Sequence, residues 1–100
     1  MITRMAAYVI VDVEIRDRER YAEYVKVAPL SIAQYGGRYL ARGGRTEKLE
    51  GSWEAKRLVI LEFESFERAR EWWGCQEYGG PKALRQAASI TNMVVVEGVE

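Results

Sequence analysis

Two arginines and a tryptophan around a glycine-containing segment are the residues best suited to hold a small ligand: Arg42, Arg57 and Trp53. A guanidinium group binds a carboxylate or an enolate through two parallel hydrogen bonds. Trp53 closes the segment, where an indole ring would form a pocket wall or lid, or would fasten the loop onto the core. The alternative for the two arginines is ion pairing at a subunit interface, and the acidic residues open to it are Asp12, Glu50, Glu62 and Glu97.

Two further aromatic residues, Trp72 and Tyr78, are candidates for the same ligand pocket. Trp72 and Trp73 are adjacent in a helical pattern, so their side chains diverge by about 100° and cannot both point inward. One of them belongs to the core, and the other lines a cleft or contacts a partner. Tyr78 lies in a polar break between helices, where its hydroxyl would meet a ligand or satisfy a backbone carbonyl. We expect the pocket where the Gly43–Trp53 loop approaches the helices around Trp72 and Tyr78.

The sequence contains no histidine. This excludes Ser-His and Cys-His nucleophile pairs and imidazole metal ligands, so we expect neither a metal nor a cofactor. Acid–base chemistry would fall to Glu62 or Tyr78, or to Asp12 and Glu97, which share a strand face with Glu62 by alternation. A carboxylate buried there would serve as a general base or would belong to an arginine-paired network. Cys75 has neither a histidine nor a pair of basic residues nearby to lower its pKa, which argues against a nucleophile.

Length and composition narrow the function classes. One hundred residues form a single domain, residues 1–100, with 48% apolar and 30% charged residues, a mixture typical of globular proteins. Fifteen basic residues balance fifteen acidic ones, so the chain lacks the basic stripe that nucleic acid binding requires. No apolar run approaches the ~20 residues of a membrane helix. The lack of a hydrophobic signal core at the start and the single cysteine favour a cytoplasmic location.

Alternation and helical spacing predict seven elements. Strands are expected over residues 6–15, 38–42, 57–64 and 92–98, the second of them short and at an edge or beside a bulge. On a regular strand Arg38 and Arg42 would share a face. The first helix should begin after Asp17 and end at Gly36, with a kink or break at Pro29.

The second predicted helix is capped by Ser65 and ends at Gly79-Gly80, and a short third helix begins at Pro81. The resulting order, β-α-β-β-α-β, is that of a ferredoxin-like α+β fold with a four-stranded antiparallel sheet covered by helices on one face. We expect the opposite face to be apolar and to form a homodimer interface, because so large an apolar patch is rarely exposed to water. The residues assigned to it are Tyr8, Ile10, Leu58, Ile60, Met93 and Val95.

Motifs along nearly the whole chain resemble a known family. The most specific is the series Gly36-Gly37-Arg38…Arg42-Gly43-Gly44…Glu50-Gly51-Ser52-Trp53, joined by Tyr21-Ala22-Glu23-Tyr24, Trp72-Trp73 and Glu77-Tyr78. Together they resemble domain-of-unknown-function family 1330 of the dimeric α+β barrel superfamily. The resemblance implies a ferredoxin-like homodimer in which two sheets face each other. That superfamily includes cofactor-independent monooxygenases, isomerases, haem-dependent enzymes and ligand binders, so the resemblance leaves the function open. Near Cys75 the family commonly has a serine, which argues against a shared catalytic role for this residue.

Two functional hypotheses follow. The first is a small homodimer that binds a small acidic or aromatic organic molecule near the Gly43–Trp53 loop. The alternative is a cofactor-independent enzyme, similar to a monooxygenase or an isomerase, that acts on a small enolisable or aromatic substrate.

Overall fold

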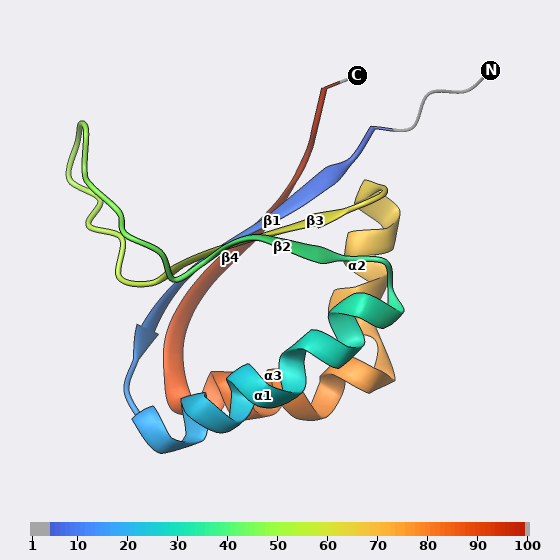
Figure 1. Ribbon diagram of the computed structural model, residues 1–100, viewed down its shortest axis with the longest axis horizontal. Helices are drawn as coiled ribbons and strands as arrows, with labels where there is room; N and C mark the ends of the chain where they lie inside the picture. Colours follow the sequence, from blue (N-terminus) through green and yellow to red (C-terminus); the bar gives the residue numbers. More distant parts are fainter. Residues whose placement is uncertain (1–4, 100) are drawn as a thin grey trace.

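In the part of the chain that the structure describes, a four-stranded antiparallel sheet carries three helices on one of its faces (Figure 1). The computed structural model describes residues 5–99. The elements in chain order are β1 (Ala7–Ile15), α1 (Arg18–Gln34), β2 (Arg38–Arg42), β3 (Leu58–Phe63), α2 (Phe66–Gly74), α3 (Gln76–Ala88) and β4 (Ser89–Glu97). The strand order β2-β3-β1-β4 is that of the ferredoxin-like α+β fold, which confirms the predicted fold class.

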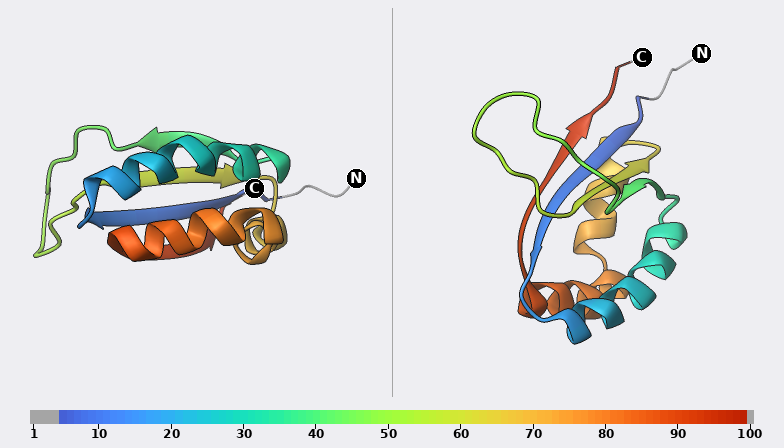
Figure 2. Two further views of the ribbon diagram at one scale, coloured as in Figure 1. Left: turned by 90° about the horizontal axis from the view of Figure 1, so that it is seen from below. Right: turned by 60° about the vertical axis from the view of Figure 1, so that its left-hand side comes forward.

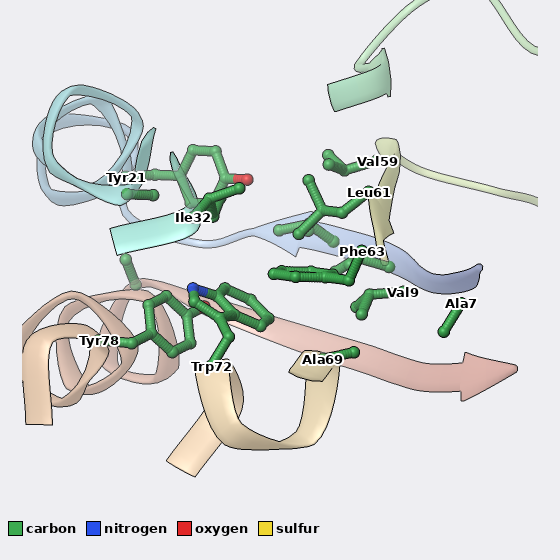
Figure 3. Packing of buried hydrophobic residues seen from close by; sticks show 14 residues of the cluster. Ala7, Val9, Tyr21, Ile32, Val59, Leu61, Phe63, Ala69, Trp72 and Tyr78 are labelled. Carbon is green, nitrogen blue, oxygen red and sulfur yellow. The ribbon is translucent and has the colours of Figure 1, made fainter. Parts of the chain in front are cut away.

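The core lies between the sheet and the helices. On β1, Ala7, Val9, Val11 and Val13 are buried, and they alternate with residues of the other face. Aromatic side chains from α1, α2 and α3 pack onto this core face, among them Tyr21, Trp72 and Tyr78 (Figure 3). The other sheet face, called the open face below, is covered by no helix, and the loop of residues 43–57 stands away from the helices (Figures 1 and 2).

The structure corrects the predicted facing of β4. Met93 pairs with Val11, and Val95 pairs with Val9, so both lie on the core face rather than on the open face. Glu97, opposite the buried Ala7, also lies on that side and does not share a face with Asp12 and Glu62. A run of apolar residues carries no polar marker of its phase, and an offset of one residue exchanges the two faces.

The open face therefore carries a different set of β4 residues. Its apolar β4 residues are Val96, Val94 and Ile90, which lie opposite Tyr8, Ile10 and Glu14 of β1, respectively. From β3, Leu58 and Ile60 lie on the open face as predicted.

A bulge in β2 separates its two arginines. Arg38 is paired with Glu62 and Arg42 with Val59, and the register shifts between Tyr39 and Ala41. Because of this extra residue, Arg38 lies on the open face and Arg42 on the core face. The prediction that they share a face is wrong for this reason.

The helix starts agree with the predicted caps in two cases. Asp17 accepts a hydrogen bond from the amide of Arg20, and Ser65 accepts one from the amide of Arg68. Helix α1 runs through Pro29 without a break. No helix within residues 5–99 has the length and apolar character to cross a membrane.

The boundary between α2 and α3 differs from the prediction. Helix α2 ends at Gly74, and α3 begins at Gln76, so Gly79 and Gly80 lie inside a helix that also contains Pro81. The sulfur of Cys75 caps α3 by accepting from the amide of Tyr78 at 3.3 Å. Tertiary packing of the fully buried Tyr78 outweighs the low helix propensity of the two glycines.

Candidate functional site

A cavity of about 20 Å³ lies between the core face of the sheet and the helices, and we call it the inner cavity. This volume holds about one water molecule. Its polar lining residues are Tyr21, Tyr24, Tyr39, Arg42, Arg57 and Arg85, and its apolar ones are Val11, Val13, Val25, Ile32, Val59, Leu61, Trp72 and Met93. Three arginines thus surround a space that is otherwise aromatic and aliphatic.

Arg57 reaches the cavity past Gly43. Gly43 has a positive φ of 68°, and a side chain at this position would collide with the Arg57 guanidinium. The guanidinium lies over the ring of Tyr21, 5.6 Å from its centroid, which is a cation–π arrangement. Its Nε atom is buried and has no hydrogen-bond partner. Buried donors without a partner are rare in folded proteins, and the Nε of Arg57 is one of them.

Asp12 fixes the backbone at the start of β3. One carboxylate oxygen accepts from the amides of Lys56 and Arg57 at 2.8 and 3.3 Å, and the other accepts from the indole of Trp53 at 2.8 Å. Burial alone would raise the pKa of Asp12, but these three hydrogen bonds hold it below its usual range. Asp12 therefore anchors the end of the loop from which Arg57 enters the cavity.

Arg42 spans the gap between β2 and α1. Its guanidinium lies 4.5 Å from the ring centroid of Tyr39 and donates to the carbonyl oxygen of Val25 at 2.8 Å. In a regular helix that carbonyl would accept from the amide of residue 29, which in this chain is Pro29 and has no N–H. Arg42 is the one exposed residue among those that line the inner cavity.

A chain of hydrogen bonds joins Arg85, Tyr78 and Tyr24 on the helix side. The Nε of Arg85 donates to the hydroxyl of Tyr78 at 3.3 Å, and the hydroxyls of Tyr78 and Tyr24 lie 2.7 Å apart. Arg85 is 5% exposed and Tyr78 is fully buried. Burial raises the pKa of Tyr24 and that of Tyr39, so both phenols remain protonated and can donate.

The charge of the cavity lining is uncompensated within the described part of the chain. No carboxylate of residues 5–99 lines the cavity. The ion pairs seen among residues 5–99 are Arg16–Glu14, Arg20–Asp17, Arg38–Glu62, Lys48–Glu54 and Arg68–Glu71, and none includes Arg42, Arg57 or Arg85. Arg85 is buried, Arg57 is half-buried and Arg42 is exposed, and buried charges are ordinarily paired.

The two adjacent tryptophans diverge as expected. Trp72 is 1% exposed, donates to the hydroxyl of Ser31 at 3.2 Å, and lies 4.2 Å from the ring centroid of Tyr78 (Figure 3). Trp73 is exposed, and the ammonium group of Lys82 lies over its ring at 3.8 Å. Trp72 therefore forms part of the core and of the cavity wall.

The structure brings together most, but not all, of the predicted pocket residues. Arg42, Arg57 and Trp72 line the inner cavity, and Tyr78 stands directly behind Tyr24. Trp53 is 61% exposed and borders a separate hollow on the open face, so it does not line this cavity.

The predicted bases lie elsewhere. Glu62 pairs with Arg38 at 2.7 Å on the open face. The carboxylate of Asp12 accepts hydrogen bonds from Trp53 and Lys56 of the loop. Glu97 is exposed on β4, a strand at the edge of the sheet. Within residues 5–99 no cluster of three or more acidic or cysteine side chains is placed to hold a metal ion.

Sequence reasoning missed Arg85, and it gave no pocket role to Tyr24 or Tyr39. The signal for Arg85 was its spacing of seven residues from Tyr78, which puts both on one face of a helix. Starting the helix at Pro81 instead of Gln76 concealed that relationship.

The fold and the cavity define a small ferredoxin-like α+β protein with an arginine- and tyrosine-lined interior. Residues 6–99 match the family described as domain of unknown function DUF1330. The chain belongs to this family, as the motifs indicated. A comparison with curated proteins finds no match.

Solved structures share the fold at low sequence identity. A protein of unknown function from Rhodopseudomonas palustris, RPA0582, is 18% identical with a TM-score of 0.78, over 97% of this chain and 85% of that one. A candidate antibiotic biosynthesis monooxygenase from Caulobacter crescentus is 16% identical with a TM-score of 0.62, over 98% and 93% of the two chains. SnoaB, a cofactor-independent oxygenase from Streptomyces nogalater, is 8% identical with a TM-score of 0.60, over 97% and 95%. Identities this low establish the shared fold alone.

Proposed function

We propose that this protein binds a small organic anion in the inner cavity. The observation that carries the proposal is the set of three arginines, Arg42, Arg57 and Arg85, around one cavity with no carboxylate in its lining. A bound carboxylate or enolate would supply the acceptor that the buried Nε of Arg57 lacks. The aromatic walls suit a ligand with a short apolar or aromatic body.

Entry of such a ligand requires the lining to move, because the cavity has room for about one water molecule. Arg42 is the side chain best placed to move, since it is exposed and is held by one backbone carbonyl and the ring of Tyr39. A ligand carboxylate offers Arg42 a charged acceptor in place of a neutral carbonyl, and arginine–carboxylate pairs can form two parallel hydrogen bonds. The ligand site therefore lies beside Gly43, at one end of the predicted loop, and away from Trp53.

The test compares carboxylates with their primary amides, namely butanoate with butanamide and benzoate with benzamide, by calorimetric titration. We expect the acids to bind and the neutral amides to bind at least tenfold more weakly, a difference of about 1.4 kcal/mol. Arg57→Met should abolish the preference for the acid. Arg38→Met is the matched control, because Arg38 is paired with Glu62 on the open face. Equal binding of acid and amide would reject the proposal.

A second candidate function is cofactor-independent catalysis on an enolisable or aromatic substrate. It is favoured by the donors Tyr24 and Arg85, which would stabilise a developing oxyanion in a buried site. SnoaB, which shares the fold, is a cofactor-independent oxygenase. Against it stands the lining itself, which contains no carboxylate to act as a base. Oxygen consumption and product formation with quinols and enolisable acids, compared between the native chain and Tyr24→Phe, decide between catalysis and binding.

We also propose that a second copy of this chain covers the open face. Val94 is 60% exposed, Ile90 54% and Val96 46%, and Val94 lies opposite Ile10, which is paired with Ile60 in the middle of the sheet. So many exposed aliphatic side chains on one face typically mark an interface. A two-fold symmetric contact between identical faces is the commonest way for a chain to cover its own apolar surface.

A further inference from the structure

We propose that the ligand is a small oxo acid, with its carboxylate at Arg42 and Arg57 and its oxo oxygen at Tyr24 and Arg85. This inference rests on the proposed function and specifies the ligand class of the same cavity. The direction in which the hydrogen bonds run around the cavity supports this assignment.

The hydroxyl of Tyr78 fixes that direction on the helix side. It accepts from the Nε of Arg85, and its own proton then needs an acceptor in a fully buried setting. The hydroxyls of Tyr78 and Tyr24 lie 2.7 Å apart and either could donate, and we assign the shared proton to Tyr78 because its oxygen already accepts from Arg85. The proton of Tyr24 is therefore left over, and Tyr24 lines the inner cavity.

The helix side of the cavity consequently offers donors. Tyr24 contributes a free O–H, and burial raises its pKa, which keeps that proton in place. Arg85 also lines the cavity, and guanidinium nitrogens can only donate. A ligand atom bound here must be an acceptor, as a keto or enolate oxygen is.

The second group of donors lies across the sheet. Arg42 and Arg57 lie over β2 and β3, whereas Arg85 lies beside Met93 of β4, at the other edge of the strand order β2-β3-β1-β4. The two donor groups thus reach the same cavity from the two sides of β1. A ligand that satisfies both needs acceptors at its two ends.

The two ends of the cavity differ in the hydrogen-bond donors that they offer to a ligand. The side of Arg42 is exposed and doubly cationic, which suits a full carboxylate charge. The inner end combines one arginine that already donates to Tyr78 with a neutral phenol, and burying a second full charge there would cost more than burying a neutral oxo group. An oxo acid fits this asymmetry better than a dicarboxylate does.

The experiment compares acetoacetate with butanoate and succinate, by calorimetric titration of the native chain and of Tyr24→Phe. We expect acetoacetate to bind about tenfold more tightly than butanoate, and more tightly than succinate. Tyr24→Phe should weaken acetoacetate about three- to tenfold and leave butanoate unchanged, which is the range for loss of one hydrogen bond. Tyr35→Phe is the matched control, because the Tyr35 hydroxyl donates to Glu77 and does not line the cavity.

The outcomes separate this inference from the proposed function. Equal affinity for acetoacetate and butanoate would overturn the oxo acid while leaving an anion site in place, and tighter binding of succinate would assign a dicarboxylate instead. If none of the three acids binds, the proposed function itself fails. If Tyr24→Phe does not fold, Arg85→Met gives the same comparison, since it should lower the preference for acetoacetate over butanoate. The preference of the native chain alone remains a decisive measurement.

Discussion

Arg42 donates a 2.8 Å hydrogen bond to the carbonyl oxygen of Val25, which is free to accept because the residue four positions further along α1 is a proline. The Val25 carbonyl would otherwise accept from the amide of residue 29, and Pro29 has no amide proton. Pro29 therefore leaves the Val25 carbonyl without a helical donor, and that carbonyl holds Arg42 beside the inner cavity.

The Arg42–Val25 bond should therefore be coupled to Pro29 in a double-mutant cycle. Arg42→Met should lower the free energy of unfolding by about 1 kcal/mol in the native chain, the typical net value for such a hydrogen bond. In a Pro29→Ala background the same change should cost much less, because an alanine has the backbone N–H that would donate to the Val25 carbonyl within the helix. Denaturant titration of the four proteins measures the coupling, and a coupling energy of zero would show that Pro29 plays no part in placing Arg42.

Asp12 should stabilise the loop in a pH-dependent way. Its folded-state pKa lies below the usual value of about 3.9, so its contribution is present above that value and is lost as the pH falls through the lower, folded pKa. Asp12→Asn should lower the free energy of unfolding by about 1 kcal/mol at pH 7. The difference from the native chain should persist to about pH 5 and shrink below about pH 4.

Glu14→Gln is the matched control for Asp12→Asn. Glu14 lies on the same strand and pairs with Arg16 at the surface, where an ion pair contributes little. Its effect should be small at every pH. A difference for Asp12→Asn that stays constant down to about pH 3 would contradict the role given to the three hydrogen bonds of this carboxylate.

The sequence was sufficient for the fold, because strands, caps and helical stripes each leave a local pattern. It was insufficient where an offset of a single residue decides which face of the sheet a side chain lies on. The apolar run Met93-Val94-Val95-Val96 fits either face of the sheet until the pairing with β1 fixes its phase. The bulge after Tyr39 likewise sends Arg42 to the core face, which no count by twos can reveal.

The candidate site was harder to predict than the fold for a related reason. Arg57 and Trp72 were assigned to a pocket from their residue types, and they do line the cavity. Trp53 was assigned with them because it is close in sequence, yet its indole turns to Asp12 on the open face. Proximity along a loop says little about which side of a sheet a side chain reaches.

The proposed homodimer predicts that a charge in the open face dissociates it. Val94→Asp should convert a dimer, with a mass near twice 11.5 kDa, into a folded monomer, because burying an unpaired carboxylate at an interface costs several kcal/mol. Leu30→Asp is the matched control, since Leu30 is 69% exposed on α1, away from the open face. Light scattering measures both variants. A native chain that is monomeric at micromolar concentration would contradict the proposal.

The central claim, an anion held by the cavity arginines, is tested most directly by the NMR signals of the arginine Nε–Hε groups during titration with butanoate. The account predicts saturable shifts for Arg57 and Arg85, which face the inner cavity without a carboxylate partner among residues 5–99. The signals of Arg38 and Arg68, paired with Glu62 and Glu71, should not move, and butanamide should have no effect. Shifts that never saturate, or that are as large at Arg38 and Arg68 as at Arg57, would contradict an anion site in this cavity.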